Sequence, residues 1–400
     1  MHLSKVEEEM LSGGSGKATE KAMQLLVALG DVLGAPRLIP IVSAQIAGVS
    51  YGNIGDAGME LLEDWASQGA KTQVKATLNP AGMDLDRWKE MGVDEEYHAK
   101  QLRIIKAFEM MGVQATCTCA PYLVGNKPRR GSHIAWSESS AICYANSVLG
   151  AMTNREGGPS ALAAALTGRT PYYGLHLKDN RKPTIVVDVK ARLCTTYDFS
   201  LLGYTVGGII GSGIPIFRGI GHPDSDRMKI MSAALAASGG IAMFHVEGVT
   251  GEAEGFDFNS VERVCIGQKE LEASREKLTS EGDPDFVCIG CPHCSLEEMK
   301  DLARMVKGKS VGRGKALWIL TSRGIYKRSK EKGYAGVIEK AGGKIFVDTC
   351  MVVCPLEKAG YKHMASNSCK AVHYVPSTSR IKASVMELSS ALEKMMEAGQ

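Results

Sequence analysis

Stretches with apolar residues at helical spacing alternate with short apolar runs along the N-terminal part of the chain. The spacing predicts helices at residues 19–33 and 95–111, the second capped by Asp94, and a further helix that begins at Asp56. The short runs that predict strands are residues 38–42, 72–78 and 113–119. This alternation is typical of an α/β fold with mostly parallel strands and crossover helices.

The pattern becomes most regular in the C-terminal third of the chain. Ser295 and Glu298 form a capping-box signature that predicts the start of a helix. The runs that predict strands in the middle and at the end of the chain are 184–189, 241–246, 286–289, 316–320 and 344–347. The last three predict a βαβαβ lobe over 286–350, and the charged stretch 252–285 before it predicts a boundary between lobes. We therefore expect N-terminal lobes at 1–270 and a C-terminal lobe at 271–400.

Composition and charge narrow the class of protein. Hydrophobic residues make up 44% and charged residues 23% of 400 residues, which is typical of a folded globular chain. The net charge of +3 is too small to indicate a nucleic-acid or membrane partner, and no apolar run approaches the length of a membrane span. The N-terminus lacks the apolar core of a signal peptide, so we expect a cytoplasmic protein. In the cytoplasm, the eleven cysteines are expected to be buried thiols or metal ligands.

One short motif resembles a catalytic one but predicts another role. The segment 48–52 matches the nucleophile-elbow pattern of serine hydrolases. A true elbow passes directly into a helix, whereas residues 53–55 are expected to intervene before the helix at Asp56. Its glycines instead favour a turn whose N–H groups hold an anionic ligand.

Several cysteines stand where α/β proteins build their sites. Cys288, Cys291 and Cys294 have ferredoxin-like spacing, yet Cys288 lies inside a predicted strand, and Cys294 is either a ligand or a bystander at a helix start. Cys119, Cys291 and Cys350 each follow a predicted strand, where side chains from separate segments can converge. Three thiolates on one iron–sulfur cluster leave one iron open as a Lewis acid for substrate.

Seven segments spread over the chain resemble one known family. These segments are 48–58, 77–82, 118–122, 136–140, 153–158, 290–293 and 366–370. Together they resemble the aconitase X family over essentially the whole chain. The resemblance implies an aconitase-like fold of several α/β lobes and an enzyme that removes water from a small hydroxy acid.

The resemblance also implies site residues, a cofactor and a partner. Cys119, Cys291 and Cys350 would hold a [4Fe-4S] cluster, which can also be isolated in a [3Fe-4S] form. Its implied substrate contacts are Gly48, Val49, Ser50, Asn79, Pro80, Glu138, Ser139 and Lys370, of which the last three are the implied catalytic residues. The general base is implied to be a serine of a separate small subunit, carrying the swivelling domain, in a heterodimer.

The implied reaction converts (R)-5-phosphomevalonate to trans-anhydromevalonate 5-phosphate and water, a step of a modified mevalonate route to isoprenoids. The alternatives are dehydration of cis-3-hydroxy-L-proline and a non-catalytic iron–sulfur protein. Two residues near the motifs have open roles: Arg155 either binds phosphate or braces Glu156, and His293 either supports the cluster or is a satisfied loop histidine.

The family commonly has glycine where this chain has Cys369. Four further cysteines lie near the site motifs and leave the ligand set open: Cys117, Cys294, Cys354 and Cys369.

Overall fold

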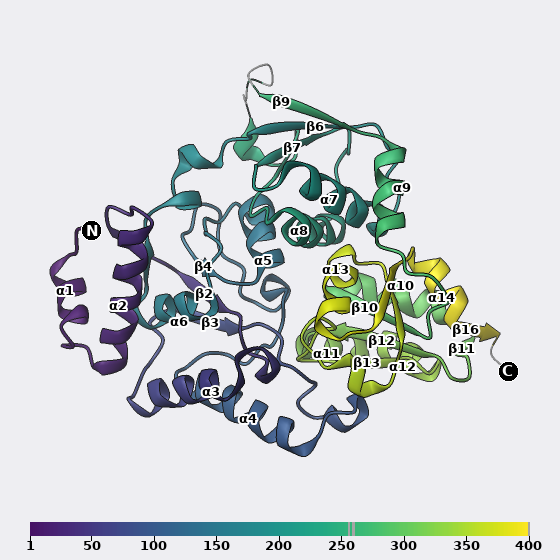
Figure 1. The fold of residues 1–400 in the computed structure, drawn as a ribbon, viewed down its shortest axis with the longest axis horizontal. Helices are drawn as coiled ribbons and strands as arrows, with labels where there is room; N and C mark the ends of the chain where they lie inside the picture. The colour runs from purple at the N-terminus through teal and green to yellow at the C-terminus, as the bar shows by residue number, and fades with distance from the viewer. Residues whose placement is uncertain (255–256, 258–260, 399–400) are drawn as a thin grey trace.

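A computed structural model describes residues 1–254, 257 and 261–398. Within these residues the fold is mixed α/β, with three parallel sheets that lie in three lobes (Figure 1). In Figure 1 the first lobe runs from purple through blue to teal, the second from teal to green, and the third from green to yellow. The expected fold class is confirmed. The expected division at residue 270 falls inside a helix and stays a prediction.

The first lobe contains a parallel sheet in the order β3-β2-β4 and an antiparallel pair, β1 with β5. Its elements are α1 (Lys5–Leu11), α2 (Lys17–Val32), β1 (Leu38–Pro40), β2 (Ser43–Ile46), α3 (Tyr51–Ser67), β3 (Lys75–Leu78), α4 (Glu95–Met110), β4 (Ala135–Trp136), α5 (Ser139–Tyr144), α6 (Gly158–Thr167) and β5 (Arg169–Pro171). Helix α6 packs against both β2 and α2, and α3 packs against α4. This arrangement buries all four residues of β2.

The second lobe contains a parallel sheet in the order β8-β7-β6-β9. Its elements are β6 (Ile185–Val189), α7 (Thr196–Ile210), β7 (Pro215–Arg218), α8 (Ser225–Gly239), β8 (His245–Val246), β9 (Glu262–Ile266) and α9 (Gln268–Lys277). Helices α7 and α8 pack against each other below the sheet in Figure 1. Helix α8 also contacts β10 of the third lobe, which joins the two lobes near the centre of the molecule.

The third lobe contains a five-stranded parallel sheet in the order β13-β12-β10-β14-β15 and the antiparallel pair β11 with β16. Its elements are β10 (Phe286–Cys294), α10 (Leu296–Val306), β11 (Lys309–Val311), β12 (Ala316–Thr321), α11 (Arg323–Glu331), α12 (Tyr334–Lys340), β13 (Lys344–Phe346), β14 (His363–Ser366), α13 (Cys369–Thr378), β15 (Lys382–Val385), α14 (Leu388–Met395) and β16 (Met396–Ala398). Strand β10 lies at the centre of the sheet and is buried along its whole length.

Short helical turns connect these elements. They are η1 (Trp88–Met91), η2 (Pro121–Leu123), η3 (Ala145–Leu149), η4 (Gly174–His176), η5 (Lys178–Arg181), η6 (Gly251–Ala253) and η8 (Leu356–Ala359).

Helix starts with strong local signals are confirmed. The Asp94 side chain accepts a hydrogen bond from the Tyr97 backbone N–H at the start of α4. The capping box of Ser295 and Glu298 starts α10. Such caps satisfy N–H groups that have no partner within the helix, so short sequence motifs identify them.

The strand expected at 113–119 is wrong. Gln114 bridges Thr77 beside β3, but the Thr116 N–H bonds back to the Gln114 carbonyl, and Cys117 has a left-handed φ of 42°. The ladder to β3 therefore stops after one residue, and Cys119 follows a loop rather than a strand.

The helix expected to begin at Asp56 begins earlier. Helix α3 starts at Tyr51, directly after Ser50, and Gly55 interrupts it with φ 59° and ψ −166°. Asp56 does not cap it; its carboxylate accepts a hydrogen bond from the Tyr51 hydroxyl. Glycine tolerates this backbone conformation, which a side chain would make costly.

The charged stretch 252–285 is not a plain connection between lobes. It contributes β9, which pairs with β6 at the edge of the second sheet, and helix α9. Residues of this stretch at 255–256 and 258–260 lie outside the described residues. The charges belong to an exposed edge strand and a polar helix, and residues 278–285 then lead into β10, so the expected boundary stays a prediction.

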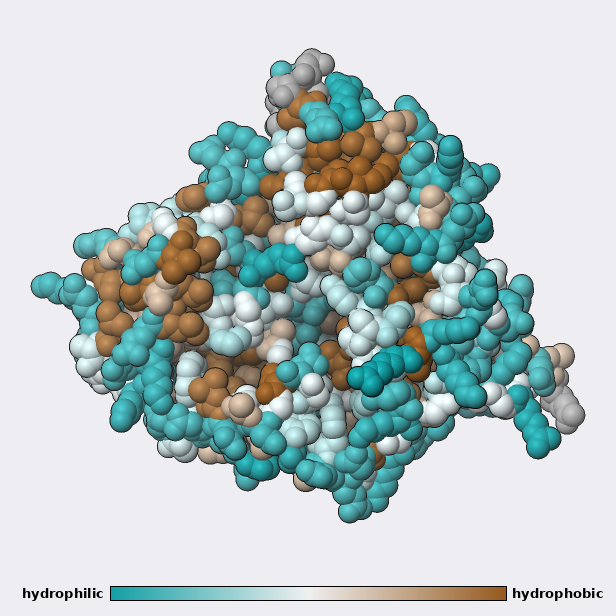
Figure 2. Space-filling model, viewed as in Figure 1, coloured by the Kyte–Doolittle hydropathy of each residue, from teal (hydrophilic) through white to brown (hydrophobic). Residues whose placement is uncertain are grey.

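Figure 2 shows the face seen in Figure 1. A hollow lies near its middle, where the three lobes meet, and hydrophobic residues gather at the left, over α1 and α2. Among the described residues, no helix combines the length and apolar character that a membrane span requires.

Candidate functional site

Three buried cysteines from separate segments approach one another beside a lysine and a glutamate. Cys119 and Cys291 are each 5% exposed and Cys350 is 8% exposed. Burial raises the pKa of the Cys119 thiol, and the nearby charges of Glu138, Cys350 and Cys291 raise it further. The pKa of Cys350 is raised by burial and then by Cys291. The geometry agrees for two of them, because the N–H of His293, two residues after Cys291, donates to the Cys119 Sγ atom at 3.2 Å.

Backbone pairing between the first and third lobes brings two of these segments together. The Ala81 N–H donates to the Asp348 carbonyl at 2.7 Å, and Ala81 forms a parallel bridge with Thr349. On the first-lobe side, the Thr118 N–H donates to the Leu78 carbonyl at 3.0 Å. Residues 79–81 are therefore fixed between the loop that carries Cys119 and the loop that carries Cys350.

Cys291 reaches the site through an irregularity in the central strand. Strand β10 continues beyond the predicted end at 289 to Cys294, but its ladder to β12 shifts register between Ile289 and Cys294. Gly290 makes the shift possible: its φ is +113°, and a Cβ there would stand 2.1 Å from the Leu320 carbonyl oxygen. Only glycine fits this close approach.

Glu138 and Lys370 form a buried ion pair next to the thiols. Glu138 caps α5, and Lys370 lies in the first turn of α13. The Lys370 Nζ atom also lies 3.5 Å from the Ser139 and Ser140 hydroxyl oxygens. Burial alone would raise the pKa of Glu138, but the Lys370 ammonium and the Ser140 hydrogen bonds lower it below its usual value. Both groups are therefore charged.

Gln45, which sequence patterns did not single out, organises the acidic side of the site. This fully buried side chain donates through Nε2 to the Asn79 Oδ1 atom at 3.2 Å, and its Oε1 accepts from the Glu138 N–H at 3.0 Å. Asn79 in turn donates through Nδ2 to the Glu138 carboxylate at 3.1 Å. Only the folded chain shows that Gln45 lies in the buried strand β2, where a polar side chain needs partners.

The loop before α3 lies against the cysteine loop. The Ser50 hydroxyl contacts the Tyr97 hydroxyl at 3.1 Å and donates to the Val353 carbonyl at 3.3 Å. The Val49 carbonyl accepts from Gln101, Gly48 has φ +75°, and Pro80 is buried beside Asn79. The residues implied by the resemblance thus share one region, while their roles stay predictions.

The connection expected at residues 53–55 is wrong, yet Ser50 lacks the surroundings of a serine-hydrolase nucleophile. Ser50 does pass directly into a helix, since α3 begins at Tyr51. However, its φ of −69° and ψ of 131° are ordinary extended values rather than those of a strained elbow. Its hydroxyl partners are a tyrosine and a carbonyl, neither of which forms a nucleophile–base pair with it.

Cys194 and Cys265 are exposed, whereas the other cysteines outside the candidate ligand set are buried. Cys288 lies within β10 opposite Trp318, as its position in a predicted strand suggested. Burial raises the pKa of Cys294, and its next largest influence is Glu298. The Cys369 N–H donates to the Ser200 hydroxyl at 2.8 Å, whereas burial and Asp348 raise the pKa of Cys117. Burial raises the pKa of Cys354 to about 12.

Arg155 neither braces Glu156 nor joins this site. Its guanidinium donates to the Gly240 carbonyl at 2.8 Å, while Glu156 accepts hydrogen bonds from Ser160 and Thr170.

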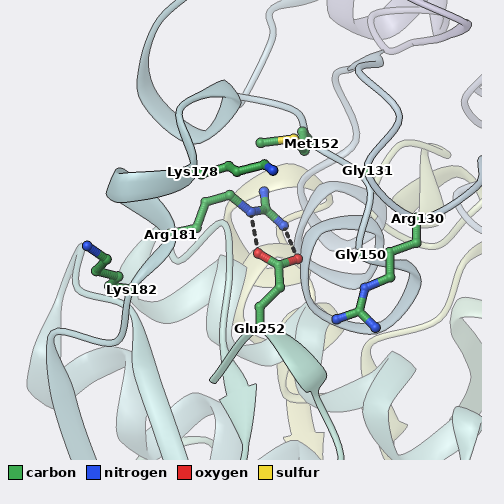
Figure 3. A pocket seen from close by; sticks show the side chains of 8 residues that line it. All are labelled: Arg130, Gly131, Gly150, Met152, Lys178, Arg181, Lys182 and Glu252. Carbon is green, nitrogen blue, oxygen red and sulfur yellow. Dashed lines mark hydrogen bonds and ion pairs between the residues drawn. The ribbon is translucent and has the colours of Figure 1, made fainter. Parts of the chain in front are cut away.

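A separate basic pocket of about 390 Å³ contains none of the candidate site residues (Figure 3). The Arg181 guanidinium points into it and is paired with Glu252 through contacts of 2.6 and 2.8 Å. Its other charged lining residues are Arg130, Lys178 and Lys182. It has neither a thiol nor a buried carboxylate–lysine pair, so we place the candidate chemistry at the cysteines.

The donor set fits an iron–sulfur cluster better than a single metal ion. Among the described residues, no group of three His, Cys, Asp or Glu side chains has the geometry to hold one ion. Each thiolate of a cluster binds its own iron, so cluster ligands need not share one ion's coordination sphere. The Cys119 Sγ accepts the His293 N–H at 3.2 Å, the kind of contact that stabilises cluster-bound sulfur. Three buried thiols with this donor therefore suit a cluster.

Family models match almost the whole chain. They are described as Aconitase X first domain over residues 1–179, Aconitase X second domain over 183–276 and Aconitase X third domain over 284–397. The crystal structure of Thermococcus kodakaraensis aconitase X in its holo-form is similar with a TM-score of 0.92. It is 43% identical and covers 99% of this chain and 100% of that chain.

Relatives with two different names align with the chain. The phosphomevalonate dehydratase large subunit of Methanocaldococcus jannaschii is 51% identical over 387 residues, which are 94% of this chain and 96% of that protein. The cis-3-hydroxy-L-proline dehydratase of Pseudomonas aeruginosa is 34% identical over 387 residues, which are 94% of this chain and 66% of that protein.

Proposed function

The chain belongs to the aconitase X family, and from that premise we propose that it is the large subunit of a phosphomevalonate dehydratase. The observation that carries the proposal is the meeting of three buried thiols with the Glu138–Lys370 ion pair. The 51% identity with a large subunit of that name, against 34% with a hydroxyproline dehydratase, supports this substrate.

The reaction is an elimination of water from (R)-5-phosphomevalonate. The carbon next to the carboxylate loses a proton, and the adjacent carbon loses its hydroxyl group. A carbon–carbon double bond forms between them, which gives trans-anhydromevalonate 5-phosphate and water. The enzyme must therefore bind the carboxylate, assist the departing hydroxyl and accept the proton.

Cys119, Cys291 and Cys350 would hold an iron–sulfur cluster, proposed as [4Fe-4S]. When bound, such a cluster supplies an iron with an open position, a Lewis acid that makes hydroxide a better leaving group. The protein contributes a dry setting for this chemistry, because the three thiols are almost fully buried. If the site were open to water, water molecules would compete with the substrate for the open position on the iron.

Lys370 provides the positive charge that binds the substrate carboxylate. Its ammonium is buried, and nearby charges, above all that of Glu138, raise its pKa, so it stays charged. A charge-assisted hydrogen bond in such a setting is stronger than one at the surface. Lys370 thereby orients the carbon that loses its proton.

Glu138 acts at the hydroxyl end of the substrate. Asn79, Ser140 and the Gln45 contact to its backbone hold the carboxylate in one orientation. A carboxylate fixed in this way can orient the departing hydroxyl or pass it a proton. The Ser139 hydroxyl, 3.5 Å from the Lys370 Nζ atom, adds a further donor for the substrate.

We further propose that a small subunit completes the enzyme as a heterodimer and supplies a serine as the base. The name "large subunit" of the Methanocaldococcus relative supports a partner. We also propose a cytoplasmic location, because the eleven cysteines are expected to be reduced thiols or metal ligands and the structure joins none of them in a disulfide.

The test is a dehydration assay on the two-subunit complex, coexpressed and purified without oxygen. We expect water loss from (R)-5-phosphomevalonate and no turnover of cis-3-hydroxy-L-proline. Turnover of hydroxyproline alone would replace the proposed substrate. An iron-loaded complex that dehydrates neither would favour a non-catalytic iron–sulfur protein.

A further inference from the structure

The imidazole of His293 connects the segments that carry all three candidate ligand cysteines. Its Nδ1 atom lies 2.9 Å from the Thr118 hydroxyl oxygen, one residue before Cys119. Its Nε2 atom lies 2.7 Å from the Thr349 carbonyl oxygen, one residue before Cys350. The residue itself stands two positions after Cys291.

The partners of the ring fix its tautomer. A carbonyl oxygen can only accept a hydrogen bond, so Nε2 carries the hydrogen and donates it to Thr349. The Nδ1 atom of this neutral ring is then an acceptor, and the Thr118 hydroxyl must donate to it. That hydroxyl oxygen accepts the Ala120 N–H at 3.2 Å. Each hydrogen bond of this link thus has a defined donor and a defined acceptor.

The backbone of His293 is anchored as firmly as its ring. Its N–H donates to the Cys119 Sγ atom, and its carbonyl accepts from the Lys229 Nζ atom at 3.2 Å. Lys229 is 1% exposed and is paired with Asp226 and Glu298. Helix α8 of the second lobe therefore holds the Cys291 segment from behind.

Direct chemistry on the substrate does not suit His293. The side chain is 1% exposed, and both ring nitrogens already have partners within the protein. A general base needs a free nitrogen within reach of the substrate. The geometry instead suits a rigid link: an imidazole carries a donor and an acceptor on different edges of one ring, which can join two loops at once.

We infer that His293 is a positioning residue that sets the spacing of the Cys119, Cys291 and Cys350 thiols and so controls how firmly the chain retains its iron. The inference rests on the proposed function only in taking these thiols as cluster ligands. Residues that orient metal ligands from outside the coordination sphere typically change metal affinity or activity about 10- to 100-fold when replaced.

The test compares the loss of iron from variants of the coexpressed complex. Under anaerobic conditions, an iron chelator is added and the visible absorbance of the cluster is followed over time. We expect His293→Ala to lose iron about 10- to 100-fold faster than the parent. His293→Gln, which can still donate to Thr349, is expected to fall between the two. Thr118→Val, which removes only the hydroxyl, should show a smaller acceleration of the same kind.

His245 offers a matched control because it is fully buried and its Nε2 atom also bonds a backbone carbonyl, that of Arg181, at 2.8 Å. His245→Gln should lose iron at the parental rate. The fraction of His293→Gln that still holds iron should keep the parental KM for (R)-5-phosphomevalonate, because the side chain does not touch the substrate.

Iron loss at the parental rate in both His293→Ala and Thr118→Val would overturn the inference. If His293→Ala does not fold, the test uses Thr118→Val and His293→Gln instead. Iron loss at the parental rate in both of these variants would then overturn the inference. Equal acceleration in the His245 control would also overturn it, since the effect would then be general destabilisation. A parent complex that retains iron but lacks dehydratase activity contradicts the proposed function alone.

Discussion

The carboxylate of Glu138 and the ammonium of Lys370, 232 positions apart in the sequence, form a buried ion pair between the first and third lobes. Both groups are charged, and neither is exposed enough for water to replace its partner. Breaking a buried pair leaves an uncompensated charge, which costs more than the pair itself contributes. The pair is therefore available to exchange partners with a charged substrate rather than to open to solvent.

Glu138→Gln is expected to lower kcat of the two-subunit complex by about 100-fold or more, because an amide cannot take part in proton transfer. The amide can still interact with Asn79 and Ser140, so the site should keep its shape. The control is Glu7→Gln, which removes a similarly buried carboxylate from its ion pair with Arg169. Equal losses of kcat in both variants would remove Glu138 from the catalytic residues.

Lys370→Met is expected to raise KM for (R)-5-phosphomevalonate by roughly 10- to 100-fold, because the carboxylate loses a charge-assisted partner. Lys370→Arg keeps the charge and should recover part of this loss. Steady-state kinetics on the iron-loaded complex separates KM from kcat. If Lys370→Met leaves both constants at parental values, Lys370 does not bind the substrate.

Cys350→Ser is expected to lower both bound iron per chain and the visible absorbance of the cluster, together with turnover. A serine oxygen is a poorer ligand for iron in such clusters than a thiolate. Cys143→Ser is the matched control, because Cys143 is buried and its pKa is influenced by Ser232 and Ser147 rather than by other cysteines. Full iron content in Cys350→Ser would exclude it from the ligand set.

Stability is expected to fall as the pH drops below about 6.5, in part because of His176. Burial, together with the neighbouring His133 and Arg181, lowers the pKa of His176 to about 3. The folded state keeps this ring neutral, whereas the unfolded chain takes up a proton below its ordinary pKa of about 6.5. Protonation therefore favours unfolding, by roughly 1.4 kcal/mol per pH unit between these two values.

Thermal unfolding measured between about pH 4 and about pH 7 checks this expectation, because an ordinary histidine gains its proton in this range. His176→Gln should show a shallower fall in Tm on acidification than the parent. Parallel Tm profiles for the two proteins would mean that His176 does not contribute to the acid sensitivity.

Local signals predicted those parts of the fold that depend on neighbouring residues. The cap at Asp94 and the capping box at Ser295 were predictable because each satisfies backbone N–H groups within one turn. The strand at 113–119 was mispredicted because its composition suits a strand, while the left-handed Cys117 and the local bond of Thr116 end the pairing. The residue pattern contains no signal that predicts such a turn.

The site depended on contacts that no local pattern contains. Cys119 and Cys350 meet because Ala81 pairs with the 348–349 backbone, and the irregularity at Gly290 places Cys291. The resemblance to a family supplied these residues, whereas spacing alone also allowed a ferredoxin-like set. Gln45 and Lys229 escaped notice, since only the folded chain shows that these polar side chains are buried.

We propose that Cys119, Cys291 and Cys350 hold an iron centre with one position open to the substrate. Mössbauer spectroscopy of the ⁵⁷Fe-loaded complex, before and after addition of (R)-5-phosphomevalonate, tests it most directly. We expect the substrate to shift the signal of one iron and to leave the others in place. A spectrum in which substrate moves no iron signal, in a complex that dehydrates the substrate, would contradict it.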